Sequence, residues 1–253
     1  MTGVQTCALP ICDRNSRLKS VLKEDREQGF DLTKGPLIRF LLFQLEFNQY
    51  MMVWSFHHIL MDGWCLGILL EDWLKNYQQL FAQQPISVEP AIPYSRYIQW
   101  IAKQDQNKAL AYWRDYLDGV KEPVGFGVRN GEKDDREHQT LTFRFSKVET
   151  EQMVEWTKCN QVTLSSFIQT VWGILLQKVH QSHDVIFGTV VSGRHSEIQQ
   201  IEKMVGLFIN TVPTRLTTKD DDLFLETVKK VQQNIFMSEK YDYISLADIQ
   251  AQT

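Results

Sequence analysis

The sequence predicts an α/β protein in which layers of strands and helices form two lobes. Stretches that alternate apolar and polar residues are mixed with stretches of helical spacing, without a regular βαβ repeat. Residues 118–137, rich in glycine and charge, interrupt this pattern and are the best candidate for a linker. With 253 residues, 43% of them hydrophobic, the chain is long enough for one domain or two.

The first twelve residues, MTGVQTCALPIC, do not lead into the charged, helical pattern that follows. They lack the basic start and long apolar run of a signal peptide and resemble a translated sequencing adapter. We therefore expect residues 1–12 to be an adapter-derived or disordered tail. The domain boundaries predicted for the rest are 13–121, a linker at 122–137, and 138–253.

The first lobe begins, after a charged helix and loop, with two apolar runs rich in β-branched and aromatic residues, 36–47 and 50–58. A polar turn joins them, which predicts an antiparallel hairpin. From Trp64 to Phe81 the apolar residues recur at helical spacing. Prolines then interrupt the chain, and residues 94–117 are expected to be helical.

The second lobe has its own alternation of strand and helix patterns. Residues 139–146 are expected to form a strand, and residues 163–180 a helix that is apolar on almost every side and therefore buried. The other predicted elements are a helix at 150–160, buried strands at 184–193 and 206–216, and an amphipathic helix at 222–240.

Composition excludes several classes of function. The net charge of −4 gives no basic surface of the kind that binds nucleic acid, and no apolar run is long enough to cross a bilayer. Cys7 and Cys12 belong to the tail, while Cys65 and Cys159 have neither metal-site nor disulfide-framework spacing. This cysteine usage is typical of a reducing cytoplasm.

The stretch SFHHILMDGW, residues 55–64, lies at the predicted junction of strand and helix. Neighbouring side chains on a strand point to opposite faces, so one of His57 and His58 should face a cleft and the other the interior. In one interpretation both are satisfied core histidines and Asp62 caps the helix. In a second the three bind a metal, and in a third one imidazole is a general base, with Gly63 giving the backbone freedom for the bend.

The third interpretation is favoured because HHILMDG resembles the HHxxxDG motif of the condensation domains of nonribosomal peptide synthetases. YSRYIQW, at 94–100, resembles the YxDYxxW-type segment of that family, with Ser95 and Arg96 where an acidic residue is usual. VGLFINTVPTR, at 205–215, resembles its (I/V)GxFxNTxxxR segment. The resemblance runs from about residue 13 to the end, and the earlier and later motifs are absent.

The resemblance implies two chloramphenicol-acetyltransferase-like lobes in a V-shaped pseudo-dimer, both incomplete here. Residues 13–121 would be the C-terminal part of the N-terminal lobe, and residues 138–253 the N-terminal part of the C-terminal lobe. Because core surface and strand edges would then be exposed, we expect the isolated chain to be poorly stable and inactive.

The resemblance also implies an acyltransferase that forms a peptide bond. In the implied reaction a carrier-bound aminoacyl amine attacks an upstream acyl or peptidyl thioester of L-configuration. The partners would be donor and acceptor carrier domains and the adjacent adenylation domain. The domain would bind no cofactor or metal of its own, since its substrates arrive on phosphopantetheine arms. The expected location is cytoplasmic, without nucleic acid or membrane.

Carried over residue by residue, the motif makes His58 the catalytic group, either a base or a positioning group for the amine. Asp62 would be structural, and its usual arginine partner lies in the missing upstream part, so we expect it to be unpaired with a raised pKa. The other residues of the predicted site are His57 as a packing residue, Gly63 as the point of close backbone approach, Trp64 as a seat for the helix, and Asn210 and Thr211 as tunnel-lining residues. Gly193 and Arg194 are interpreted as an ordinary turn.

Three other functions stay open at this point. An epimerase domain of the same superfamily also carries HHxxxDG, although the residues after the motif are more typical of condensation. A non-catalytic module that recruits tailoring enzymes would tolerate a degraded motif, whereas here the motif is intact. A free-standing acyltransferase that uses coenzyme A could employ the same histidine.

Overall fold

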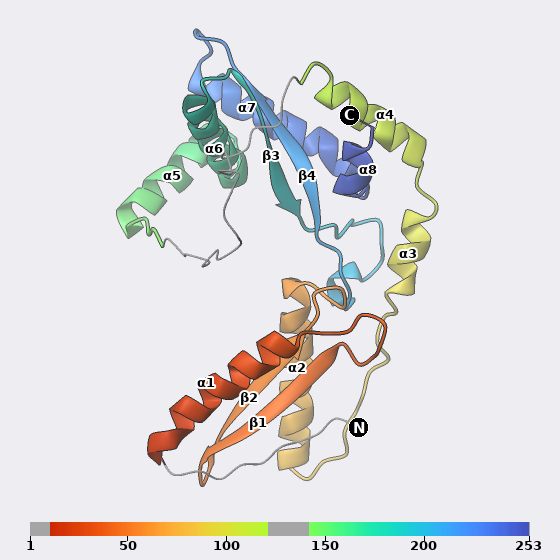
Figure 1. The fold of residues 1–253 in the computed structure, drawn as a ribbon. Helices are drawn as coiled ribbons and strands as arrows, with labels where there is room; N and C mark the ends of the chain where they lie inside the picture. The colour runs from red at the N-terminus through yellow and green to blue at the C-terminus, as the bar shows by residue number, and fades with distance from the viewer. Residues whose placement is uncertain (1–10, 121–141, 253) are drawn as a thin grey trace. The chain divides into compact units, whose positions relative to one another are not determined.

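The computed structural model describes residues 11–120 and 142–252, which form two compact units (Figure 1). The first unit is Met1–Ile98 with Arg194–Phe208, and the second is Gln99–Gly193 with Ile209–Thr253. The chain therefore leaves the first unit, builds much of the second, and returns to the first for one short segment. The predicted linker and residues 1–10 of the predicted tail lie outside the described residues.

The first unit contains helix α1 (Ile11–Gln28), the strands β1 (Ile38–Glu46) and β2 (Gln49–Phe56), and helix α2 (Gly63–Phe81). The strands pair antiparallel with Ile38 opposite Phe56, and the register shifts between Gln44 and Glu46. Both the hairpin and the helix predicted from periodicity are confirmed.

A shared carboxylate holds α1 to the hairpin. Arg39 on β1 and Ser55 on β2 face each other across the strands, and both donate hydrogen bonds to Asp25 on α1, at 2.7 and 2.6 Å. Burial alone would raise the pKa of Asp25, but these two hydrogen bonds and the charge of Arg39 hold it below its ordinary value. The Arg39 guanidinium also lies 4.0 Å from the centre of the Phe30 ring.

The second unit contains most of the remaining elements. Residues 94–117, expected as one helical stretch, form helices α3 (Ser95–Ile101), which spans the boundary of the two units, and α4 (Gln106–Leu117). Asp105 separates them because its side chain accepts a hydrogen bond from the Lys108 N–H and so begins a new helix. The others are helices α5 (Lys147–Cys159), α6 (Leu164–His180), α7 (Phe224–Ser238) and α8 (Leu246–Gln250), and antiparallel strands β3 (Asp184–Val191) and β4 (Asn210–Thr217).

Two clusters of buried side chains hold the second unit together. Helices α4 and α8 meet β4 in one cluster, and α6 and α7 pack on the β3–β4 hairpin in the other (Figure 1). The first cluster comprises Ala109, Trp113, Leu117, Val212, Ile244 and Ile249, and the second Leu176, Val185, Leu216 and Val231. Arg215 pairs with Asp184 at 2.7 Å and donates to the carbonyl of Tyr116, so it has a structural position.

Two expectations for this unit are wrong. Residues 142–146, the described part of the predicted strand, pair with no other strand, and Ser146 instead begins α5 with a capping box. Helix α6 is not buried on all sides, because one set of its apolar residues is exposed: Leu164, Ile168, Val171, Trp172, Leu175 and Val179. Apolar composition shows that a helix needs cover, but not that neighbouring elements supply it.

Within the two described stretches, no helix combines the length and the apolar character that crossing a membrane requires.

Two adjacent leucines of α6 test this arrangement, since Leu175 is 51% exposed and Leu176 is 4% exposed. Leu176→Ala should lower the free energy of unfolding by about 2–5 kcal/mol through the cavity it leaves. Leu175→Ala should change it by about 0.5 kcal/mol or less, and should reduce self-association of the chain. Urea denaturation and light scattering measure the two effects, and equal losses of stability would contradict the packing described.

Candidate functional site

The two histidines lie in the loop between β2 and α2. The His57 N–H donates to the Leu37 carbonyl at 3.0 Å, and the Leu60 N–H then donates back to the His57 carbonyl at 3.1 Å. Strand β2 ends at Phe56, so both histidines follow the strand. The alternation of faces expected for neighbouring strand residues therefore does not constrain them.

His57 is half-buried and shapes the loop. Its Nδ1 accepts a hydrogen bond from the Ile59 N–H at 3.1 Å, which requires a ring whose Nδ1 carries no proton. The ring also meets Phe30 edge to face, with 6.3 Å between ring centres. Since Phe30 lies under Arg39, His57 is tied to the network that joins α1 to the hairpin.

His58 is exposed, so the interpretation in which both histidines are buried in the core is wrong for this residue. Within residues 11–120 and 142–252, His58 has no side-chain hydrogen bond or ion pair. Its ring is therefore open to a ligand, on a loop whose two ends are held. Among the same residues, no three His, Cys, Asp or Glu side chains are grouped so that they could hold a metal ion.

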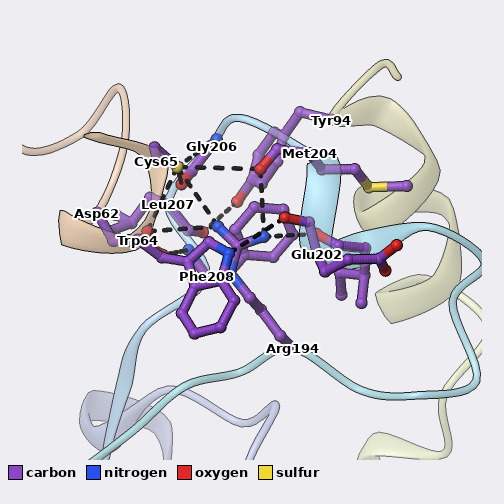
Figure 2. Close-up of polar contacts among 11 residues, drawn as sticks. Asp62, Trp64, Cys65, Tyr94, Arg194, Glu202, Met204, Gly206, Leu207 and Phe208 are labelled. Carbon is purple, nitrogen blue, oxygen red and sulfur yellow. Dashed lines mark hydrogen bonds and ion pairs between the residues drawn. The ribbon is translucent and has the colours of Figure 1, made fainter. Parts of the chain in front are cut away.

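Asp62 is fully buried and paired, so the expectation of an unpaired carboxylate is wrong (Figure 2). Its Oδ2 accepts from the Phe208 N–H at 3.0 Å, and its Oδ1 lies 3.4 Å from the Arg194 guanidinium. Burial would raise the pKa of Asp62, but the bonds from Phe208 and Cys65 and the charge of Arg194 hold it below its ordinary value. Asp62 stands at the N-cap of α2, yet its side chain caps no helix N–H.

Arg194 is the residue that sequence reasoning missed, and its interpretation as part of an ordinary turn is wrong. Its side chain is almost fully buried and donates to the carbonyls of Ile201 at 2.5 Å and Met204 at 3.2 Å. The guanidinium also lies 3.9 Å from the centre of the Phe208 ring (Figure 2). A buried carboxylate demands a cation, but Asp62 and Arg194 are 132 positions apart, so no local pattern joins them.

Trp64 and Gly63 begin α2. Trp64 is 58% exposed, and its Nε1–H donates to the Glu202 carbonyl at 3.1 Å, which joins the start of the helix to the returning segment. Gly63 does not have a positive φ, and a Cβ added to it would meet no atom within 4 Å. The expected backbone freedom is therefore not what requires glycine here.

The two other motif-like segments pack on each other within the first unit. The Tyr94 hydroxyl donates to the Leu207 carbonyl at 2.5 Å, and its ring meets the Phe208 ring edge to face. A Cβ at Gly206 would overlap the Tyr94 ring, so glycine is required there. Burial, with the charge of Asp62, raises the pKa of Tyr94.

Asn210 and Thr211 lie in the second unit, at the start of β4. The Asn210 amide donates at 2.6 Å to the carbonyls of both Asp242 and Ile244, and its oxygen accepts from the Thr211 N–H at 2.8 Å. The Asn210 side chain therefore holds the segment after α7. The role of both residues in lining a tunnel stays a prediction.

The contacts of Asp62 predict that its contribution to the free energy of unfolding depends on pH. Asp62→Ala leaves Arg194 buried without its carboxylate and should lower the free energy of unfolding by about 3–5 kcal/mol at pH 7. Because folding lowers the pKa of Asp62, its contribution is complete above the unfolded value of about 3.9 and is lost as the pH falls through the folded value. Urea denaturation at pH 7 and pH 3 should therefore show a smaller deficit at pH 3.

The exposed Asp115 provides the control, since Asp115→Ala should cost about 0.5 kcal/mol or less at either pH. An Asp62→Ala deficit that does not change with pH would show that the ionised carboxylate is not the stabilising form.

Comparison with known proteins gives matches along nearly the whole chain. A family model described as the condensation domain matches residues 11–253. Gramicidin S synthase 2 of Brevibacillus brevis is 43% identical over 242 residues, which cover 95% of this chain and 5% of the synthase. Surfactin synthase subunit 3 of Bacillus subtilis is 40% identical over 241 residues, which cover 95% of this chain and 19% of the subunit.

Solved structures match the fold. The X-domain in its complex with OxyB from teicoplanin biosynthesis has a TM-score of 0.80 at 21% identity, covering 100% of this chain and 56% of that one. The first condensation domain of the calcium-dependent antibiotic synthetase, in complex with a substrate analogue, has a TM-score of 0.74 at 18% identity. This match covers 100% of this chain and 57% of that one. The chain thus spans a small part of the synthetases and just over half of these solved chains.

Proposed function

Because this chain belongs to the condensation-domain family of nonribosomal peptide synthetases, we propose that it takes part in forming a peptide bond. The attacking group is the amine of an aminoacyl residue on an acceptor carrier domain, and the target is an L-configured acyl or peptidyl thioester on a donor carrier domain. Both substrates travel on phosphopantetheine arms, and an adenylation domain of the same synthetase loads the acceptor. No cofactor or metal of the domain itself takes part.

The observation that supports this proposal is the exposed His58 ring on a fixed loop. His57 holds the start of the loop through its bond with the Ile59 N–H, and Asp62 holds the end through Phe208 and Arg194. The His58 imidazole, a group that can donate or accept a hydrogen bond, is here presented to ligands rather than to the core. This is the arrangement that a general base or an amine-positioning group requires.

In the proposed reaction the amine nitrogen attacks the thioester carbonyl carbon. A C–N bond forms and the C–S bond breaks, so the donor arm leaves as a thiolate that takes up a proton. His58 accepts the proton released by the amine nitrogen, or orients that amine by a hydrogen bond. General-base catalysis contributes about 100- to 10,000-fold, and holding two tethered substrates together contributes further by making the encounter local.

The open space at Gly63 supports a second element of the proposal. No atom of the described chain needs glycine there, so the space is left for a substrate that approaches the backbone. Gly63 is the first residue of α2, where the backbone N–H has no partner within the helix, so this N–H is also available to stabilise the oxyanion of the tetrahedral intermediate.

A recruitment module is the second candidate, because the X-domain that shares this fold is in complex with OxyB. An epimerase is the third and would invert a carrier-bound residue without joining two of them. In a recruitment module, changing His58 should leave partner binding and product formation by other domains unaltered.

The decisive experiment uses the complete parent domain with loaded donor and acceptor carriers. His58→Ala should lower the rate of dipeptidyl-carrier formation by about 100- to 10,000-fold, measured by intact mass. His183→Ala, at another exposed histidine, should leave the rate unchanged. Undiminished product from the His58 variant would remove His58 from the mechanism, and an inverted but unjoined residue would indicate an epimerase.

The variant Gly63→Ala tests whether a substrate uses the space at Gly63, because it should lower activity without lowering stability. Because the added methyl meets no atom and alanine favours a helix by up to about 1 kcal/mol over glycine, the variant should be as stable as the wild type or more stable. Its rate of product formation should nevertheless fall by about 10-fold or more through misplaced substrate. Thermal melting and the carrier assay check this together, and a fully active variant would show that the space is not used.

A further inference from the structure

Cys65 is a buried thiol that the proposed mechanism does not use. It is a free cysteine, 0% exposed, in the first turn of α2 and three residues after Asp62. At this spacing in a helical turn its side chain lies on the same side of the turn as Asp62. It faces the returning segment Arg194–Phe208 (Figure 2).

The sulfur contacts polar groups on both sides. The Cys65 Sγ lies 3.2 Å from the Gly206 carbonyl oxygen and 3.3 Å from the Asp62 Oδ1, with the Met204 carbonyl oxygen farther away at 3.9 Å, and these three acceptors compete for its single S–H. The Gly206 N–H, at 3.3 Å, and the Arg194 guanidinium, at 3.4 Å, donate to the sulfur. The thiol therefore acts as donor and acceptor at once, between a carboxylate and a guanidinium.

Gly206 makes this contact a rigid one. Its carbonyl also accepts the Asp62 N–H at 3.2 Å, and the Tyr94 ring occupies the place where its Cβ would lie. The backbone at residue 206 therefore cannot move away from α2 without losing several contacts. Cys65 is the side chain that reaches both backbone groups of this residue.

We propose that Cys65 is a positioning residue for the peptide-bond-forming site. Its thiol holds the Asp62 carboxylate and the first turn of α2 against Gly206, and so fixes the end of the loop that presents His58. This inference rests on the proposed function, because it assigns Cys65 to the same site. Cys65 acts through Asp62 and the backbone and does not touch the substrates.

The chemistry of sulfur explains why the residue is suited to this place. A thiol is a small, mostly apolar group that is tolerated when fully buried, and its hydrogen bonds are longer than those of a hydroxyl. Serine keeps a donor and an acceptor on a shorter bond, so it should restore part of the function. Alanine leaves the Gly206 N–H and one Asp62 oxygen without this partner, in a place that water does not reach.

Loss of the thiol should also change the titration of Asp62. The groups that lower the pKa of this carboxylate are Cys65, Arg194 and the Phe208 N–H, and its charge in turn raises the pKa of Tyr94. The hydrogen bond from Cys65 is among the causes that keep the pKa of Asp62 low. Without it the pKa rises, so the acid limb of any activity that needs ionised Asp62 should move to higher pH.

The first test uses the complete parent domain and iodoacetamide, with peptide mapping by mass spectrometry. Cys159 is exposed and serves as the internal reference. Cys65 should be alkylated at least about 100-fold more slowly than Cys159, because reaction requires local opening. Asp62→Ala should remove most of this protection, whereas equal labelling of Cys65 and Cys159 in the wild-type domain would overturn the proposal.

The second test uses the complete parent domain with loaded carriers. Cys65→Ala should lower kcat by about 10- to 100-fold with little change in KM for the carriers, and should shift the acid limb of the pH profile upward. Cys65→Ser should recover part of kcat, and Cys159→Ala should behave as the wild type. A merely structural role would reduce the amount of folded domain without shifting the pH profile.

The alkylation test and the carrier assay together distinguish failure of this inference from failure of the proposed function. If His58→Ala abolishes product while Cys65→Ala keeps wild-type kcat and pH profile, the function stands and the positioning role is wrong. If the wild-type domain forms no product, the proposed function is wrong, and the alkylation test alone decides whether Cys65 holds the loop to Gly206.

Discussion

The first unit depends on one buried carboxylate. Asp62 is removed from water by the packing around it, and an ionised carboxylate in such a place is tolerated only with a cation and hydrogen-bond donors. Arg194 and the Phe208 N–H provide them, and both come from a segment that returns after most of another unit has been built. The position of α2, and of the loop before it, follows from this long-range contact.

The loop is held at both ends for different reasons. At its start, the half-buried His57 accepts the Ile59 N–H and packs on Phe30, which Arg39 covers. At its end, Asp62 is fixed by the returning segment. His58 lies between these two points and is exposed, while His57 and Asp62 make the contacts that hold the loop. The two adjacent histidines thus differ in environment, because only the His57 side chain is hydrogen-bonded to the backbone.

Aromatic packing joins segments of the first unit that are distant in sequence. The Tyr94 ring fills the space beside Gly206, and the Tyr94 and Tyr97 rings pack on Phe208, whose N–H binds Asp62. The segment that contains Gly206 and Phe208 therefore contacts both of the others, Tyr94 and Tyr97 by packing and Asp62 by a hydrogen bond.

Local patterns in the sequence were sufficient for the β1–β2 hairpin, for α2 and for the place of the HHxxxDG-like loop, because alternation and helical spacing are properties of neighbouring residues. They could not show that Asp62 leaves its helix uncapped and binds Arg194, or that Arg194 is more than a turn residue. Nor could they show that one side of α6 stays exposed and that residues 142–146 find no strand partner. Ion pairs, cover for a helix and strand pairing join distant residues, so only the folded chain decides them.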